Sequence, residues 1–286
     1  MLSNKVREIM TRDIVTAGIT DRISDVMKVM ATKNVGRVVI MDNRVPVGIF
    51  TEQDVLRRVM NKKLDPKKAT IKRVMTTPIR SVREEARIVD VLGKMYRGKF
   101  RHMVVCGEKR VMVGLVSMRR ILKLAVELGH DPTGTQTIGS MMSTKLVTVD
   151  VSQSIYDTIE VMVKKDTHCV IVLSRGELKG IFTERDVLRR VAIKNIDTRK
   201  TPIKKVMTTD PIPMAHSAPI EEVLAQMYHN DFRNIPVLGD HGELAGIVSM
   251  GDVLKYAKAL DVDESVRKAR KEIEEHWDSV DHYTPG

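Results

Sequence analysis

Aromatic residues are scarce in this sequence: four Phe, five Tyr and one Trp make up 3% of its 286 residues. Proteins that bind single-stranded nucleic acid usually stack the bases on aromatic side chains, and no such platform accompanies the basic residues here. The net charge of +11 still favours anionic partners such as nucleotides, RNA or acidic lipid. We interpret most of this charge as a solvated basic surface, and an RNA-binding or protein-interaction scaffold is the alternative.

Cysteine and long apolar runs are also scarce. The two cysteines, Cys106 and Cys169, lie in separate apolar segments and form no CxxC pair. This favours buried reduced thiols over a disulfide or a structural zinc site, and no metal site is predicted. No apolar run approaches the roughly 20 residues that cross a bilayer, and the N-terminus has no signal-like apolar region. We therefore expect a cytoplasmic protein that does not enter the membrane.

Common catalytic motifs are absent as well, because the sequence contains no Walker A motif, no GxGxxG after a strand, no HExxH and no GxSxG. What it contains instead is a repeat. The phrase Gly-Ile-Phe-Thr-Glu-Gln-Asp-Val-Leu at Gly48 returns in similar form at Gly114, Gly180 and Gly246, each 66 residues after the last. The repeats fill most of the chain, so we expect no separate catalytic domain, no enzymatic activity and no catalytic cofactor.

Every unit shows the same order of predicted elements. A strand-like segment is followed by a helical stripe, two apolar runs separated by turn residues, and a second helical stripe. The first stripe recurs in all four units: Ile23, Val26, Met27, Met30; Ile88, Val91, Leu92, Met95; Ile155, Thr158, Ile159, Met162; Ile220, Val223, Leu224, Met227. The predicted fold is therefore α+β, with unit order strand-helix-strand-strand-helix.

One unit is small for a stable core, so we expect pairs of units to form two modules. The predicted boundaries are 1–66, 67–133, 134–198 and 199–262, followed by a charged tail over 263–286. Residues 129–136, rich in Gly, Pro and Thr, are the predicted linker between the modules. The two modules of one chain, or those of a homodimer, would then face each other as a disc with pseudo-twofold symmetry.

A polar inset ends each repeated phrase just where the second helix begins. Three units carry a hydroxyl followed three residues later by a carboxylate, at Thr51 and Asp54, Thr183 and Asp186, and Ser249 and Asp252. This spacing is typical of a capping box, which satisfies free backbone amides at the helix start. The same amides attract phosphate, and an ionised Asp offers two acceptors to the hydroxyls of a ribose. The residues alone leave both interpretations open.

The combined pattern resembles the CBS domain, whose tandem pairs are called Bateman modules. The resemblance covers about residues 5 to 260 and includes the opening segments at Val6, Ile71, Ile138 and Ile203 as well as the four closing phrases. It implies a cleft between paired repeats that binds AMP, ADP, ATP or S-adenosylmethionine. By that resemblance, Asp54, Asp186 and Asp252 hold ribose, while Thr51, Thr183 and Ser249 face phosphate.

Unit 2 departs from this pattern because Ser117 is followed by Arg120 where the other units carry Asp. An arginine does not accept hydrogen bonds from ribose, and its planar fork suits phosphate, so we predict that Ser117 and Arg120 contact phosphate from a neighbouring cleft. The gamma subunit of AMP-activated protein kinase is similar in this exchange. We therefore expect up to three nucleotide sites; a solvated helix-start residue is the alternative for Arg120.

A second polar set precedes each hairpin, about 12 residues before the repeated Gly, at positions that we take as equivalent. In CBS proteins residues there commonly contact phosphate, and a structural role is the alternative. The predicted phosphate contacts are Arg37, Arg101, His102, His168 and Arg233. The predicted adenine pocket consists of apolar residues from the first strands and from the repeated phrase: Ile14, Leu146, Ile212, Ile49, Ile181 and Ile247.

We therefore expect this protein to be a sensor of energy or metabolite state. The expected ligand is an adenine nucleotide, with S-adenosylmethionine as an alternative. The expected output is a change in the arrangement of the modules or of a regulated protein partner, which requires the ligand to prefer one arrangement.

Overall fold

The computed structural model describes residues 5–98, 100–108, 111–121 and 137–253. The predicted linker over 129–136 and the predicted tail over 263–286 lie outside these residues.

Units 1 and 3 follow the predicted order closely. In unit 1 the elements are α1 (Val6–Ile9), β1 (Thr16–Gly18), α2 (Ile23–Thr32), β2 (Arg37–Asp42), β3 (Val45–Thr51), α3 (Glu52–Asp54) and the π-helix η1 (Val55–Met60). In unit 3 they are η4 (Ile138–Ser140), β7 (Thr148–Asp150), α6 (Ile155–Lys164), β8 (Cys169–Ser174), β9 (Glu177–Thr183), α7 (Glu184–Asp186) and the π-helix η5 (Val187–Ala192). The predicted second helix therefore begins as one α-helical turn and continues as a π-helix.

Units 2 and 4 repeat this order up to the start of the second helix. Unit 2 contains η2 (Ile71–Arg73), β4 (Ser81–Arg83), α4 (Ile88–Arg97), β5 (His102–Cys106) and β6 (Met112–Ser117). Unit 4 contains η6 (Ile203–Lys205), β10 (Thr208–Thr209), β11 (Met214–Ala215), α8 (Ile220–His229), β12 (Asn234–Leu238) and β13 (Leu244–Ser249). In both units a helical turn follows at once, over 118–121 and 250–253.

The sheet topology is the same in every unit. The first strand runs parallel to the second, and the second forms an antiparallel hairpin with the third, as in β1-β2-β3. The helical stripes explain why a helix covers each sheet. Met30, Met95, Met162 and Met227, which end the four stripes, are all buried. The two cysteines are buried and free, as predicted.

The opening segment of each unit packs on the neighbouring unit. Val6 and Ile9 of α1 lie in the core of unit 2, and Thr11 pairs with Leu115 of β6. Conversely, Ile71 of η2 is fully buried in the core of unit 1. The same exchange joins units 3 and 4, where β10 adds to the edge of β9. Units 1 and 2 therefore form one module, and units 3 and 4 form the second.

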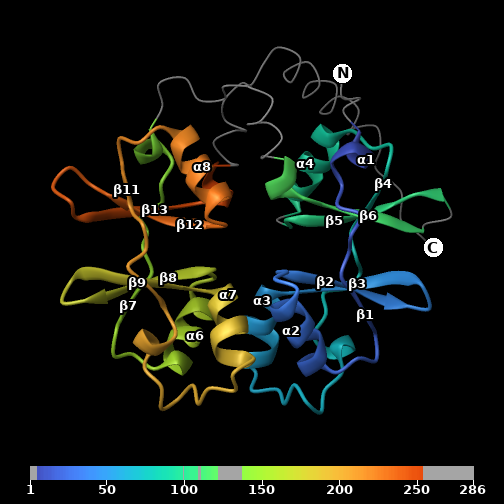
Figure 1. Cartoon of the computed structure of the whole chain (residues 1–286), viewed down its shortest axis with the longest axis horizontal. Coiled ribbons are helices and arrows are strands. Elements are labelled where there is room, and N and C mark those ends of the chain that lie inside the picture. Colours follow the sequence, from blue (N-terminus) through green and yellow to red (C-terminus); the bar gives the residue numbers. More distant parts are fainter. Residues whose placement is uncertain (1–4, 99, 109–110, 122–136, 254–286) are drawn as a thin grey trace.

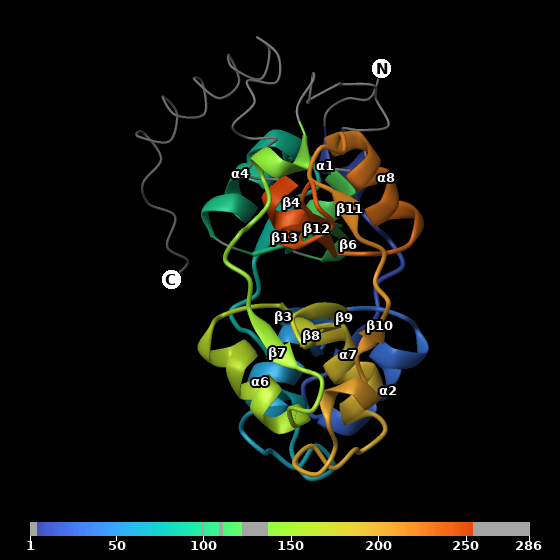
Figure 2. The same cartoon turned by 90° about the vertical axis from the view of Figure 1, so that its left-hand side faces the viewer.

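The two modules stand side by side, with units 1 and 3 forming one half of the molecule and units 2 and 4 the other (Figures 1 and 2). The helices of units 1 and 3 share one core, in which Ile23 and Leu56 lie with Ile155 and Leu188. The sheets of units 1 and 2 meet through Val39, Val104, Cys106 and Leu115. This places the start of each second helix, and so each polar inset, near the centre of the molecule. In the described part of the chain, no helix is long and apolar enough to span a bilayer.

Candidate functional site

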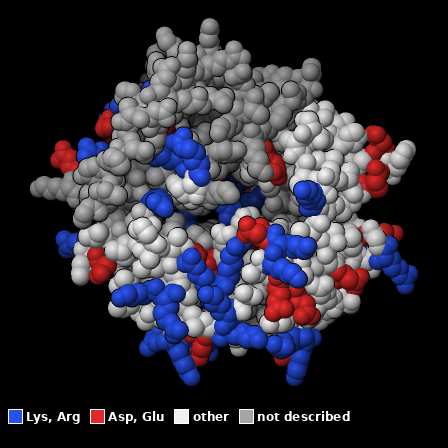
Figure 3. Space-filling view, turned by 180° about the vertical axis from the view of Figure 1, so that it is seen from behind, with Lys and Arg blue, Asp and Glu red and all other residues white. Residues whose placement is uncertain are grey.

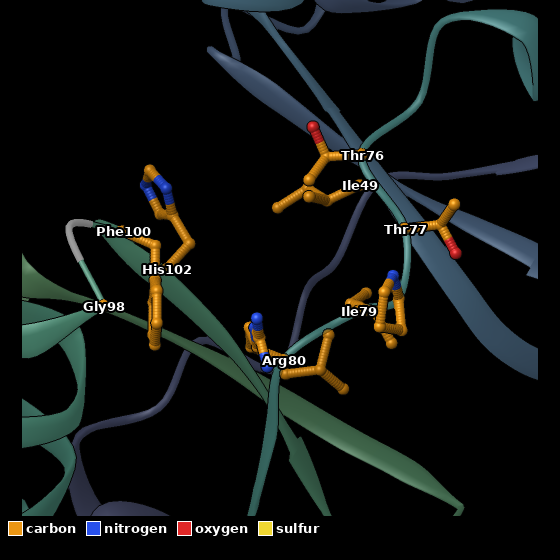
Figure 4. A pocket seen from close by; sticks show the side chains of 10 residues that line it. Ile49, Thr76, Thr77, Ile79, Arg80, Gly98, Phe100 and His102 are labelled. Carbon is orange, nitrogen blue, oxygen red and sulfur yellow. The ribbon is translucent and has the colours of Figure 1, made fainter.

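A cleft lies between the two units of module 1. Ile49 of β3 and the segment that follows η2 form one wall, while Phe100 and His102 form the opposite wall (Figure 4). The cavity has a volume of about 240 Å³, and ten residues line it: Ile49, Thr76, Thr77, Pro78, Ile79, Arg80, Gly98, Phe100, His102 and Val104. The walls combine apolar surface with a few hydroxyl and basic groups, as expected of a small-molecule site.

Each predicted ribose acid lies at the start of a helix and participates in capping. The amide of Thr51 donates to Oδ2 of Asp54 at 2.9 Å, and the Thr51 hydroxyl donates to the same oxygen at 2.8 Å. Thr183 and Asp186 repeat these bonds at 2.9 and 2.7 Å. In unit 4 the Ser249 amide and hydroxyl reach Asp252 at 3.0 and 2.5 Å. The capping interpretation is therefore correct, but it uses one carboxylate oxygen of each Asp and leaves the other for further contacts.

The second oxygen of Asp54 faces the cleft wall. The Thr76 hydroxyl, which lines the cleft, donates to Oδ1 of Asp54 at 3.1 Å, and Arg58 lies 3.3 Å from the same oxygen. In module 2, Arg190 lies 3.2 Å from Oδ1 of Asp186. Burial raises the pKa of both carboxyl groups, although hydrogen bonds from threonine and the nearby arginines oppose the change. Both acids are thus buried acceptors, and Thr76 connects Asp54 to the cleft of module 1.

Arg120 occupies the place of the missing acid. Its Nε donates to the backbone carbonyl of Ile9 in the opening segment of unit 1. Arg58 makes the matching contact in unit 1, donating to the carbonyls of Val74 and Met75 at 2.9 and 2.7 Å. Arg120, which occupies the position of the Asp in the other units, thus binds the opening segment of unit 1 through its side chain. Its backbone amide donates to the Ser117 hydroxyl at 3.3 Å. The phosphate contact of Ser117 and Arg120 stays a prediction.

The polar set before the hairpins contains two adjacent positions, so our treatment of it as one position was wrong. Arg37 pairs with Thr51 and His102 with Ser117 at the first residue of the hairpin. Arg101, His168 and Arg233 lie one residue earlier, as shown by their carbonyls, which accept from the amide after each Thr or Ser. Counting back from the repeated Gly gives His102 and His168 the same place, but the hairpin loop of unit 2 is longer by one residue than that of unit 3, so their positions differ by one.

These basic residues converge at the centre of the molecule. Burial, followed by the charges of Arg37, Arg101 and Arg233, holds the pKa of His102 well below its ordinary value. Burial and the charge of Arg233 lower the pKa of Arg37 to about 10, against an opposing effect of Glu52. Side chains from three units thus act on one another here. On the face shown in Figure 3, Lys and Arg side chains gather around a central hollow.

Two buried glutamates at this centre were not predicted from the sequence. Glu52 and Glu184 directly follow Thr51 and Thr183, and their exposed fractions are only 2% and 4%. Arg233 donates to Glu52 at 2.6 Å, and His168 lies 2.7 Å from Glu184. A signal was present, because units 1 and 3 carry Glu at this position while units 2 and 4 carry Met118 and Met250.

The predicted adenine residues divide into two groups. Ile49 lines the cleft and pairs with Thr76, while Ile181 and Ile247 pair in the same way with Thr208 and Ser143. These three side chains occupy equivalent places beside the opening segment of the companion unit.

The residues before the first strands fit less uniformly. Ile79, which we did not predict, lines the cleft two residues before β4, and Ile14 and Leu146 hold the same place before β1 and β7. The hairpin loop of unit 4 is longer by one residue than that of unit 1, so Pro211 takes this place in unit 4. Ile212, which is 53% exposed, follows it at the place that Arg80 has in the cleft of module 1, and its adenine contact stays a prediction.

Within the described residues, no group of three or more His, Cys, Asp or Glu side chains is arranged to hold a metal ion. The site therefore consists of apolar walls, helix-start acids and a central set of cations.

Comparison with known proteins gives a consistent result. The family model of the CBS domain matches residues 6–61, 71–127, 138–193 and 203–259. The CBS domain-containing protein CBSCBSPB1 of Arabidopsis thaliana is 26% identical over 292 residues, which cover 89% of this chain and 54% of the relative. The chain thus spans about half the length of the curated relatives that it matches.

Among solved structures, protein MJ1225 from Methanocaldococcus jannaschii, described as a proposed archaeal homologue of γ-AMPK, superposes with a TM-score of 0.76 at 18% identity. An uncharacterized conserved protein from Pyrococcus horikoshii gives a TM-score of 0.60 at 19% identity. Each alignment covers 88% of this chain and 99% of the other. These similarities show a shared fold.

Proposed function

Because the chain belongs to the CBS domain family, we propose that it is a non-catalytic regulatory protein that binds adenine nucleotides in the clefts of its two modules. The observation that carries this proposal is the composition of the cleft in module 1. Apolar side chains line its walls, and Thr76, which lines it, donates to the buried carboxylate of Asp54. His102 also lines the cleft and lies within the electrostatic influence of Arg37, Arg101 and Arg233.

Each part of an adenine nucleotide has a matching part of this site. The adenine ring would lie against Ile49 and Ile79, which supply apolar contact. The second oxygen of Asp54, which contacts Thr76 and Arg58, can accept a further hydrogen bond from a ribose hydroxyl, and Asp186 and Asp252 are the proposed ribose contacts of their own units. Phosphate requires cations or free amides, and the basic residues at the centre supply the cations.

Signalling requires the ligand to favour one arrangement of the modules over another. The phosphate-binding residues proposed here come from both modules, so a bound nucleotide would contact both at once. Its binding energy would then depend on how the modules sit against each other, and a regulated protein that contacts both would sense the difference.

Calorimetric titration of the ligand-stripped full chain with AMP, ADP, ATP and S-adenosylmethionine tests this function. We expect saturable binding of at least one nucleotide, with no more than three sites per chain. At 100 times its dissociation constant, a ligand at one site should stabilise the fold by about 2.7 kcal/mol. Binding that disappears at moderate salt for every compound would instead indicate a nonspecific polyanion surface and refute the proposal.

A further inference from the structure

Two buried carboxylates lie among the cations that are proposed to receive phosphate. Glu52 and Glu184 occupy the first helical position after the Thr of the inset, in units 1 and 3 only. Acidic residues are almost never fully buried unless they are paired. Their place beside a phosphate site is unexpected, since a carboxylate repels the ligand that the site is built to attract.

Each glutamate is held by an arginine from the other module. Arg233 of module 2 donates to Oε2 of Glu52 at 2.6 Å, and Arg101 of module 1 lies 3.7 Å from Oε2 of Glu184. These pairs are related by the internal symmetry, because Glu52 corresponds to Glu184 and Arg101 to Arg233. Gly36 permits the tighter pair: a Cβ there would lie 2.9 Å from Arg233 and 3.0 Å from Glu52.

The second oxygens of the two glutamates differ in their partners. Oε1 of Glu184 faces His168 at 2.7 Å. Oε1 of Glu52 is buried and makes no hydrogen bond within the described residues, and Arg185 lies 3.6 Å from it. A buried carboxylate oxygen without a hydrogen bond is costly, so Glu52 is held in place against a desolvation penalty.

The cleft leads directly to these pairs. His102 lines the cleft, and the charges of Arg37, Arg101 and Arg233 act on its ring. A phosphate chain that extends past His102 therefore meets arginines that already carry a carboxylate. Each added phosphate gains the attraction of these arginines but also meets the repulsion of Glu52 or Glu184, and that repulsion grows with ligand charge.

We propose that Glu52 and Glu184 are specificity-determining residues that select nucleotides by the charge of their phosphate chain and disfavour ATP relative to AMP. This inference rests on the proposed function, since it concerns the same clefts. Neutralising one glutamate removes one negative charge from the centre. ATP carries about two more negative charges than AMP, so its affinity gains more from the change.

The experiment compares AMP and ATP affinities of the full-length chain with those of Glu52→Gln and Glu184→Gln, by calorimetry at fixed ionic strength. We expect either substitution to raise the affinity for ATP about tenfold more than that for AMP. Glu52→Asp retains the charge and should keep the wild-type ratio. Glu177→Gln is the matched control, because Glu177 is exposed and its side chain accepts from Lys179 at 2.8 Å, away from the central arginines.

The outcomes separate the two proposals. If the wild-type chain binds none of AMP, ADP and ATP, the proposed function is wrong, and the proposed selectivity is wrong with it. If the wild type binds nucleotides and a folded Gln variant keeps the wild-type ratio of affinities, or shifts it toward AMP, only the selectivity is overturned. Thermal unfolding identifies the variants that are folded, and either Gln variant alone is enough for the comparison.

Discussion

Asp186 caps a helix and is proposed to hold the ribose of a ligand, and the substitution Asp186→Asn separates these two roles. Asn retains a carbonyl oxygen at the position of Oδ2, which accepts from the Thr183 amide at 2.9 Å and from its hydroxyl at 2.7 Å. The substitution removes the negative charge and replaces Oδ1, the oxygen nearest Arg190, with an amide nitrogen when the capping bonds are kept. The cap therefore survives, while the second acceptor is lost.

The two roles predict different magnitudes. Loss of a complete cap costs about 1 kcal/mol, so a variant that retains the capping acceptor should lose less than that in unfolding free energy. The pair with Arg190 is partly exposed on the arginine side and adds little. A hydrogen bond to a charged group is worth about 1.5 to 3 kcal/mol, which corresponds to a loss of nucleotide affinity of about tenfold to a hundredfold.

Urea unfolding measures the first quantity, and calorimetric titration with AMP and ATP measures the second. Asp157→Asn is a control at another helix start, on an exposed face of α6, where the Ser154 hydroxyl donates to Oδ2 of Asp157 at 2.7 Å and accepts from the Asp157 amide at 3.0 Å. The control should leave nucleotide affinity unchanged. Equal affinities in wild type and Asp186→Asn, whatever the change in stability, would refute the ribose assignment and leave capping as the only role.

Three further predictions concern stability. Burial raises the pKa of Asp54, so the folded chain binds a proton at this carboxylate more tightly than the unfolded chain does. The unfolding free energy should therefore rise as the pH falls from the pKa of the folded state to that of the unfolded state. Urea titrations across this pH range should show that Asp54→Asn abolishes the part of the rise that is due to Asp54. Arg233→Met leaves Glu52 buried without its closest partner and should cost about 3 kcal/mol; a loss below about 1 kcal/mol in urea unfolding would contradict this. Gly180→Ala places a Cβ 2.6 Å from the Thr208 carbonyl, so the melting temperature should fall by several degrees, and an unchanged value would show that β10 moves freely.

Much of the fold follows from periodicity in the sequence. The stripe ending at Met30 or Met162 specifies a helix with one buried face, and alternation around the turn at Asp42 specifies a hairpin. The capping boxes at Thr51 and Thr183 could also be predicted, because their bonds join residues three apart. These features depend on local spacing, which a repeat displays four times over.

Long-range features were harder to predict. The packing of α1 on unit 2 leaves no local signal, because an apolar opening segment is equally compatible with its own unit. Counting residues from the repeated Gly treated Ile212 as the equivalent of Ile14 and merged two basic positions, since a one-residue change in loop length cannot be detected from a fixed period. The burial of Glu52 could not be predicted because charged residues are normally exposed. It is explained by the contact with Arg233, which lies in another unit far along the sequence.

The four units are of two chemical kinds, which differ in the charged side chains that they place at the centre of the molecule. Units 1 and 3 supply the buried acids Glu52 and Glu184, while units 2 and 4 supply Arg233 and Arg101. Each acid has an arginine partner across the module boundary, Arg233 for Glu52 and Arg101 for Glu184, and Glu184 also contacts His168 of its own unit. The pairing of these acids with arginine therefore requires both modules. A ligand that draws an arginine away from its glutamate would act on the contact between modules, so the proposed selectivity for phosphate charge and the proposed communication between modules would share one structural cause.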